Sequence, residues 1–209
     1  MSNPATYISD LYYFPPLSWY VMAQPAAVIQ MDVHAHYQKG SWRNRCYIAG
    51  PHGLQLLSVP LERGKNERRP FKDVKISQSE RWQQQHWRTL EACYRRSAYF
   101  EFFEDDLAPF YQRPYTFLLD WNLDLLRFTF KPLKMAPDII MTTSYQPFQP
   151  DNPFDIRAQN TKDTRHAALG ATLAPYQQVF GERYAFLPNL SILDHLFNKG
   201  LSAIEKNNT

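Results

Sequence analysis

Cysteine and long apolar runs are scarce in this chain, and each shortage excludes a class of protein. The 209 residues include two cysteines, Cys46 and Cys93, which are too few for a secreted disulfide framework and lie in no zinc-binding pattern. No stretch reaches the roughly 20 apolar residues that span a bilayer, and Met1–Asp10 lacks the basic and then apolar form of a signal peptide. We therefore expect a cytoplasmic protein with reduced thiols and no membrane span.

Glycine is also scarce, with 7 residues against 16 prolines, and no glycine-rich cofactor motif is present. The sequence contains neither a GxxxxGK[ST] nor a GxGxxG phosphate loop, and it has no Gly-x-Ser-x-Gly nucleophile elbow. We expect no bound cofactor, and a phosphate group would have to be held mainly by side chains. No recognition helix or RNA-binding signature is evident, so nucleic acid is not an expected partner.

The composition is that of an ordinary folded protein, but its charge is unevenly placed. Hydrophobic residues make up 44% of the chain and charged residues 21%, and the length suits a single domain over residues 1–209. Between Ser41 and Phe100 there are 12 Lys and Arg against 5 Asp and Glu, whereas residues 101–209 carry 10 against 13. The local basic excess favours a small anionic ligand, although a solvated charged face would give the same pattern.

Strand patterns crowd into the first third of the chain, and helical patterns follow. Apolar and alternating runs predict extended segments over Ile8–Trp19, stopped at Phe14-Pro15-Pro16, and over Ala26–Val33, Arg45–Ile48, Leu54–Leu61 and Asp138–Thr143. Apolar residues that recur every three or four positions predict helices over Ser79–Arg96, Phe102–Gln112 and Tyr115–Phe130. Pro114 is expected to lie in the first turn of the third helix. The order favours an α/β fold in which a small mixed sheet is covered by several α-helices in two or three layers.

A further helix is predicted near the end of the chain, over Ile192–Lys199. Ser191 is placed to cap its first turn, and Asp194 three positions later completes a capping-box pattern. Gly200 supplies the expected stop. The pattern between Asp155 and Leu173 permits no assignment.

The densest group of candidate functional residues lies between Asp32 and Arg45. On an extended chain His34, His36 and Gln38 share one face, because side chains repeat every two residues. Either histidine is a candidate for proton transfer. The alternative is that both are surface histidines without a role. A metal site is not expected, because no third ligand accompanies the pair.

Basic and aromatic residues follow the two histidines. Lys39, Arg43 and Arg45 suit a phosphate or carboxylate, and Trp42 could stack on a ring. Surface salt bridges are the alternative role of the two arginines. Together with the histidines, these residues predict a site for a small anionic or sugar-nucleotide ligand.

A second candidate group lies on the predicted helix over Ser79–Arg96. His86 is one turn after Trp82 and close to Arg88, and if that face lines a pocket, His86 is a candidate general acid or base. A packed helix histidine is the alternative. Trp82 and Arg88 are then candidate ligand-binding residues.

Several separated motifs resemble the WbqC-like protein family, in the same order and over nearly the whole chain. They are Tyr12-Tyr13-Phe14-Pro15-Pro16, His36-Tyr37-Gln38-Lys39, Arg43-Asn44-Arg45, Trp82 with His86-Trp87-Arg88, and Leu187–Asp194 continuing to Gly200. The resemblance implies an association with bacterial surface-polysaccharide (O-antigen) biosynthesis but no established mechanism. We include Tyr13 and Asn44, from these motifs, among the candidate ligand-binding residues.

Two functions of different classes follow from these residues. The first is a transferase that moves an acyl or aminoacyl group onto an activated, nucleotide-linked amino sugar, with His36 as general base and Lys39, Arg43 and Arg45 on the phosphate. The second is a non-catalytic binding or scaffold protein of the same pathway, which the lack of a recognisable catalytic motif favours. The oligomeric state is left open.

Overall fold

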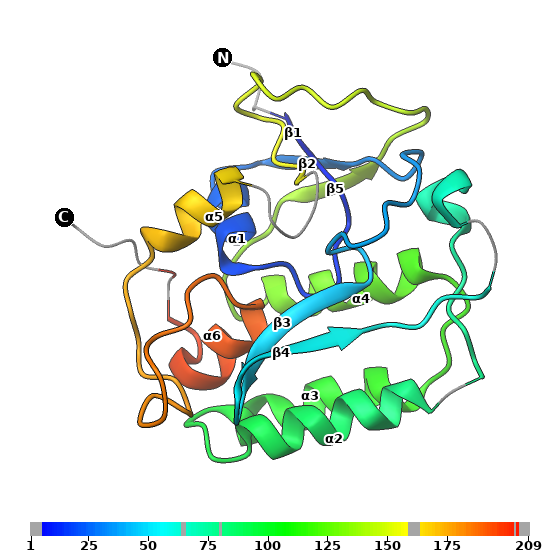
Figure 1. Cartoon of the computed structure of the whole chain (residues 1–209). Helices are drawn as coiled ribbons and strands as arrows, with labels where there is room; N and C mark the ends of the chain where they lie inside the picture. The colour runs from blue at the N-terminus through cyan, green and yellow to red at the C-terminus, as the bar shows by residue number, and fades with distance from the viewer. Residues whose placement is uncertain (1–5, 64–65, 80, 159–163, 203, 205–209) are drawn as a thin grey trace.

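The strands form two separate sheets in the computed structural model, which describes residues 6–63, 66–79, 81–158, 164–202 and 204 (Figure 1). The first sheet is parallel, in the order β1 (Thr6–Ser9), β2 (Val28–Met31) and β5 (Asp138–Met141). The second is an antiparallel hairpin of β3 (Arg45–Gly50) and β4 (Gly53–Ser58). The predicted α/β class is confirmed, with the strands divided between two sheets.

The parallel sheet is extended by a segment from late in the chain. Ile8 donates its backbone N–H to the carbonyl of Phe154 across 2.8 Å and accepts from the N–H of Ile156 across 2.9 Å. This segment therefore runs parallel to β1 on the edge opposite β2. The carboxyl ends of four parallel stretches, β1, β2, β5 and residues 154–156, therefore lie at the same end of the sheet. The sequence pattern between Asp155 and Leu173 had not predicted the fourth stretch.

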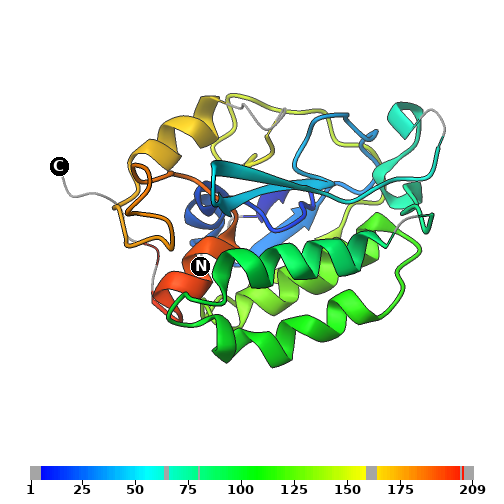
Figure 2. The ribbon, with the colours of Figure 1, turned by 60° about the horizontal axis from the view of Figure 1, so that its bottom comes forward.

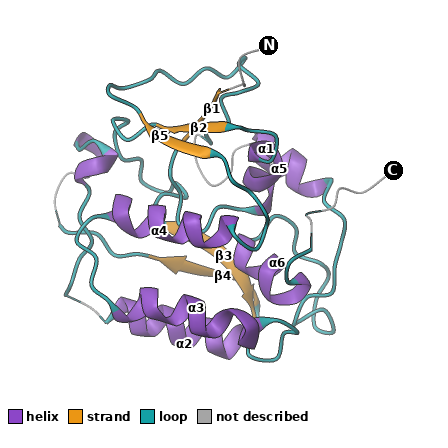
Figure 3. Cartoon of the chain, turned by 180° about the vertical axis from the view of Figure 1, so that it is seen from behind, coloured by secondary structure: helices purple, strands orange, loops and turns teal. Residues whose placement is uncertain are grey.

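Most of the described helices lie below this sheet and around the hairpin in the views of Figures 1 and 3, whereas α5 (Thr164–Ala171) lies beside the sheet. The described helices are α1 (Leu17–Ala23), α2 (Trp82–Tyr94), α3 (Phe100–Gln112), α4 (Leu118–Phe130), α5 (Thr164–Ala171) and α6 (Ile192–Lys199), with short 3-10 turns η1 (Asn66–Arg68) and η2 (Phe71–Asp73). Helices α2 and α3 lie side by side (Figure 2). They run antiparallel, because Gln83 early in α2 donates to the carbonyl of Phe110 late in α3. Within the described residues, no helix is both long and apolar enough to cross a bilayer.

Helix α1 is the main element that the sequence pattern missed. The predicted stop at Phe14-Pro15-Pro16 is confirmed, but Leu17–Trp19, the end of the predicted extended segment, belongs to this helix. All of α1 except Met22 is buried, so the helix shows no polar face and hence no period of three to four residues. Its aromatic side chains pack on α4, where the Tyr20 hydroxyl bonds to Thr129 Oγ1 across 2.7 Å.

Two helix starts also differ from prediction. Helix α4 begins at Leu118, so Pro114 precedes it and does not occupy its first turn. Backbone hydrogen bonds to another segment explain why the helix begins later than predicted. Ile76 donates its N–H to the carbonyl of Thr116, and Leu118 donates its N–H to the carbonyl of Val74. The predicted helix over Ser79–Arg96 forms over the shorter range of α2, and α3 begins two residues earlier than predicted.

The end of the chain confirms the last predicted helix but not its capping box. Ser191 Oγ accepts from the backbone N–H of Leu193 across 3.3 Å, and Gly200 ends α6 with a positive φ of 65°. Asp194 does not reach back to Ser191. Its carboxylate is wholly buried and accepts instead from Tyr94, Tyr176 and Gln178, so this residue ties α6 to its neighbours.

Candidate functional site

A cavity of about 900 Å³ opens at the carboxyl ends of the parallel strands. Parallel strands end at one edge of a sheet, which is where ligands bind in open α/β folds. The lining residues come from the segments that follow β1, β2, β5 and the strand-like stretch 154–156: Asp10, His34, Ala35, His36, Tyr37, Gln38, Lys39, Arg43, Tyr145, Phe148, Arg157 and Ala158. We refer to this cavity as the strand-end pocket.

The segment after β2 presents its polar side chains alternately, as predicted. Ala35 and Tyr37 are buried, whereas His34 is half-buried and His36 and Gln38 are exposed. The buried carboxylate of Asp32 fixes the start of the segment by accepting from the backbone N–H groups of His34 and Ala35. The structure therefore brings both histidines to the strand-end pocket.

Arg43 and Asp10 form a buried ion pair in the wall of the pocket. Arg43 Nη2 lies 2.8 Å from Asp10 Oδ1, and Nη1 donates to the backbone carbonyl of His36 across 2.9 Å. Burial opposes the charged form of Arg43, but Asp10 beside it outweighs this effect, and the pKa of Arg43 is raised. Arg43 therefore stays charged and holds the His36 backbone in place.

A second buried cation, Arg157, also lines the pocket. Its guanidinium donates to Asp32 and Asp155 and to the backbone carbonyls of Gln146 and Pro147, so all five of its N–H groups are used. Asp32 lies at the end of β2, whereas the other partners lie after β5 and beside β1. Arg157 therefore joins the strand ends, and its N–H groups have no capacity left for a ligand.

Tyr13 and His86, both predicted site residues, lie in the core and do not reach the pocket. The Tyr13 hydroxyl lies 3.0 Å from His86 Nδ1 and 3.1 Å from the hydroxyl of Tyr111. Burial lowers the pKa of His86 to about 4, so its ring is neutral at pH 7. Trp82, a third predicted residue, packs edge-on against His86 and is buried too.

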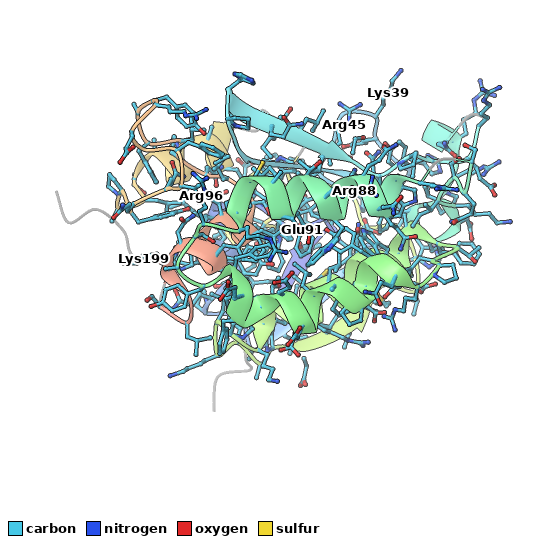
Figure 4. All side chains as sticks on the ribbon, turned by 90° about the horizontal axis from the view of Figure 1, so that it is seen from below. Lys39, Arg45, Arg88, Glu91, Arg96 and Lys199 are labelled. Carbon is cyan, nitrogen blue, oxygen red and sulfur yellow. The ribbon has the colours of Figure 1, made fainter. Side chains whose placement is uncertain are left out.

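The remaining predicted residues also lie outside the pocket. Trp42 is 5% exposed, and its ring is nearly perpendicular to those of Tyr12 and His166, so it is packed in the core and not open to a ligand. Asn44 is buried as well and donates to the carbonyl of Val59. Arg45 on β3 and the exposed Arg88 on α2 are not among the lining residues; Figure 4 shows Arg88 on α2 and Arg45 beside the hairpin.

The sequence reasoning missed several residues of the pocket. Asp10 stands directly before the Leu11-Tyr12-Tyr13 run, so its position next to a family motif was an available signal. Tyr145, Phe148 and Arg157 gave no signal, because they lie in irregular chain more than 100 residues from His36. Among the described residues, no three His, Cys, Asp or Glu side chains gather closely enough to hold a metal ion.

These features define an α/β protein with a polar pocket at the carboxyl edge of a parallel sheet. A model of the WbqC-like protein family matches residues 11–171, and the chain belongs to this family. The uncharacterized protein Rv1507c of Mycobacterium tuberculosis is 36% identical over 75 residues, which cover 36% of this chain and 32% of that protein. The chain thus matches about a third of that relative's length. No solved structure matches the chain significantly.

Proposed function

We propose that the protein binds a nucleotide-linked amino sugar in the strand-end pocket and transfers an acyl or aminoacyl group to it during synthesis of a bacterial surface polysaccharide. The observation that carries the proposal is that His36, Lys39 and Arg43 line one cavity of about 900 Å³. Ligand pockets of roughly 300–1,000 Å³ hold molecules of this size. Membership of the WbqC-like family supports the pathway.

Lys39 and Arg43 are the groups that would hold the phosphates. Lys39 is exposed, and its ammonium carries three donors. The contacts within the described chain use one N–H of each terminal nitrogen of Arg43, for the carbonyl of His36 and for Asp10. One further N–H on each nitrogen is available to an anionic oxygen, because a guanidinium has five donors.

Tyr145 and Phe148 supply aromatic surface on the side of the pocket that follows β5. Tyr145 is 57% exposed and Phe148 is half-buried. An aromatic ring can pack against a sugar ring or a nucleobase. The pocket therefore combines an anion-binding side with an apolar side, as a nucleotide-linked sugar requires.

His36 is the group that would transfer the proton. Its imidazole is exposed in the pocket, and no described residue hydrogen-bonds it. In the proposed reaction the sugar amine attacks the carbonyl carbon of an acyl thioester or aminoacyl ester. A C–N bond forms as the C–S or C–O bond breaks, and the amine proton passes through His36 to the leaving thiolate or alkoxide.

Calorimetric titration with uridine and thymidine diphosphate sugars tests the binding step. Lys39→Ala should weaken the binding of a nucleotide sugar by about tenfold, because a charged hydrogen bond is lost. Lys131→Ala is the matched control: it removes an exposed lysine after α4, outside the pocket, and should leave the affinity unchanged. The binding proposal fails if no compound of the panel binds or if Lys39→Ala binds as tightly as the wild type.

Mass spectrometry of the sugar nucleotide after incubation with an acyl donor tests the transfer step. His36→Asn should retain binding while product formation falls by about 10²–10⁴-fold. Binding without any product in the wild-type protein would instead support the non-catalytic binding protein.

A further inference from the structure

Three buried carboxylates lie near the strand-end pocket, and they differ in how many of their acceptor positions are used. Asp32 Oδ1 accepts from two backbone N–H groups and from Thr142, and its Oδ2 accepts from the backbone of Gln146 and from Arg157. Asp155 accepts on both oxygens from Arg157 and from backbone N–H groups. Neither of these two carboxylates lines the pocket.

Asp10 differs in both respects. It lines the pocket, and within the described chain its oxygens have two donors: Arg43 at 2.8 Å on Oδ1 and the Tyr12 hydroxyl at 3.3 Å on Oδ2. A carboxylate can accept about four hydrogen bonds. Asp10 Oδ2 therefore keeps acceptor capacity, because its described bond is single and long.

The groups around Asp10 favour its role as an acceptor. Burial raises the pKa of Tyr12 well above its usual value, and its hydroxyl also accepts from the backbone N–H of Ala158 across 2.7 Å. Tyr12 is thus held in place as a protonated donor to Asp10. Arg43 stabilises the ionised carboxylate from the other side across the 2.8 Å ion pair.

We propose that Asp10 is a specificity-determining residue, whose Oδ2 accepts a hydrogen bond from a free ammonium group of the sugar; this ammonium releases one proton to solvent before the neutral amine attacks. The inference rests on the proposed function and names its substrate class: an amino sugar that has not yet been acylated. An ammonium brings three donors and a positive charge to the carboxylate. An N-acyl group brings one N–H and a carbonyl oxygen, and a hydroxyl brings one neutral donor, so both bind Asp10 more weakly.

Calorimetric titration with UDP, UDP-glucose, UDP-N-acetylglucosamine and UDP-glucosamine separates this inference from the proposed function. UDP alone measures binding of the phosphates, whereas the ratios among the three sugars measure the contribution of Asp10. The wild-type protein should prefer UDP-glucosamine by about tenfold over each of the other two sugars. Asp10→Asn should reduce this preference to about onefold, measured as the ratio of the affinities for UDP-glucosamine and UDP-glucose within the variant, so that any change in phosphate binding cancels.

The wild-type protein provides a second measurement, which does not depend on the folding of Asp10→Asn. Its preference for UDP-glucosamine over UDP-glucose should disappear as the pH rises through the pKa of the amine, measured on the free ligand. If no UDP compound binds, the proposed function fails. The role of Asp10 can then still be tested by comparing the affinities for glucosamine 1-phosphate and glucose 1-phosphate. The inference would be overturned if the wild-type protein bound the amino sugar and the matching hydroxyl sugar with equal affinity. It would also be overturned if the preference for the amino sugar persisted in Asp10→Asn.

Discussion

Arg43 and Asp10 meet across 2.8 Å with side chains that are 3% and 5% exposed, and their ion pair links the segment after β2 to the end of β1. Because Arg43 also holds the carbonyl of His36, the same guanidinium positions the proposed base. Stability of the fold and geometry of the pocket therefore depend on one pair of residues.

Arg43→Met should lower the free energy of unfolding by about 3–5 kcal/mol, because it leaves the Asp10 carboxylate buried without its partner. The double variant Asp10→Leu with Arg43→Met should lose less than the sum of the single variants, since no uncompensated charge is left. Urea unfolding measures all three. Arg95→Ala is the control, because Arg95 pairs with Glu91 and Glu104 at the surface, and it should change little. Additive single effects at Arg43 and Asp10 would contradict the coupling.

His86 should make the protein less stable in mild acid. Its pKa is about 4 in the folded protein and near 6.5 in an unfolded chain, so between these pH values the unfolded chain binds more protons. The free energy of unfolding should fall by about 3 kcal/mol as the pH is lowered from about 6.5 to about 4. Urea unfolding at several pH values measures the slope.

His86→Gln is the comparison that isolates this effect. The buried carboxyl of Asp194 has a raised pKa, which contributes a slope of opposite sign in the acid range, and its contribution cancels between the two proteins. The variant should therefore show a flatter loss of stability below pH 6.5. Identical pH profiles for the two proteins would rule out His86 as the source.

The parts of the site that the sequence predicted are those set by local pattern. Alternation along one extended segment placed His34, His36 and Gln38 on one side, and burial of Ala35 and Tyr37 confirms it. The α/β class followed equally from the order of strand and helix patterns. Local periodicity indicates which way a side chain faces, and this was sufficient to place His34, His36 and Gln38 on one side of their segment.

The parts that could not be predicted depend on contacts between distant residues. Arg157 reaches Asp32 across 125 positions of sequence, and no periodicity of either segment encodes that pairing. His86 and Trp82 recur at helical spacing whether their face lines a pocket or a core, and the structure places them in the core. Helix α1 was missed for a related reason, because a helix buried on nearly all sides has no polar period.

Buried tyrosines should set the alkaline limit of the fold. Burial raises the pKa of each of these residues above its usual value of 10: Tyr12, Tyr13, Tyr20, Tyr94, Tyr111 and Tyr176. Above pH 10 the folded protein therefore holds more protons than the unfolded chain, so stability present below pH 10 is lost as the pH rises. Tyrosinate absorbance from these residues should appear together with the loss of helical circular dichroism. Their ionisation in a protein that stays helical would show that they are accessible.

Gly200, at the end of α6, should tolerate a side chain less well than Gly40. Both have a positive φ, 65° and 80°, so alanine costs about 1 kcal/mol or more at either position. At Gly200 an added Cβ would also lie 2.8 Å from the ring of Tyr99, whereas at Gly40 no atom lies within 4 Å. Gly200→Ala should therefore lower the melting temperature more than Gly40→Ala does, and adding Tyr99→Ala should recover the difference if the clash with the ring causes it. Equal losses from the two glycine variants would instead assign the whole cost to the backbone.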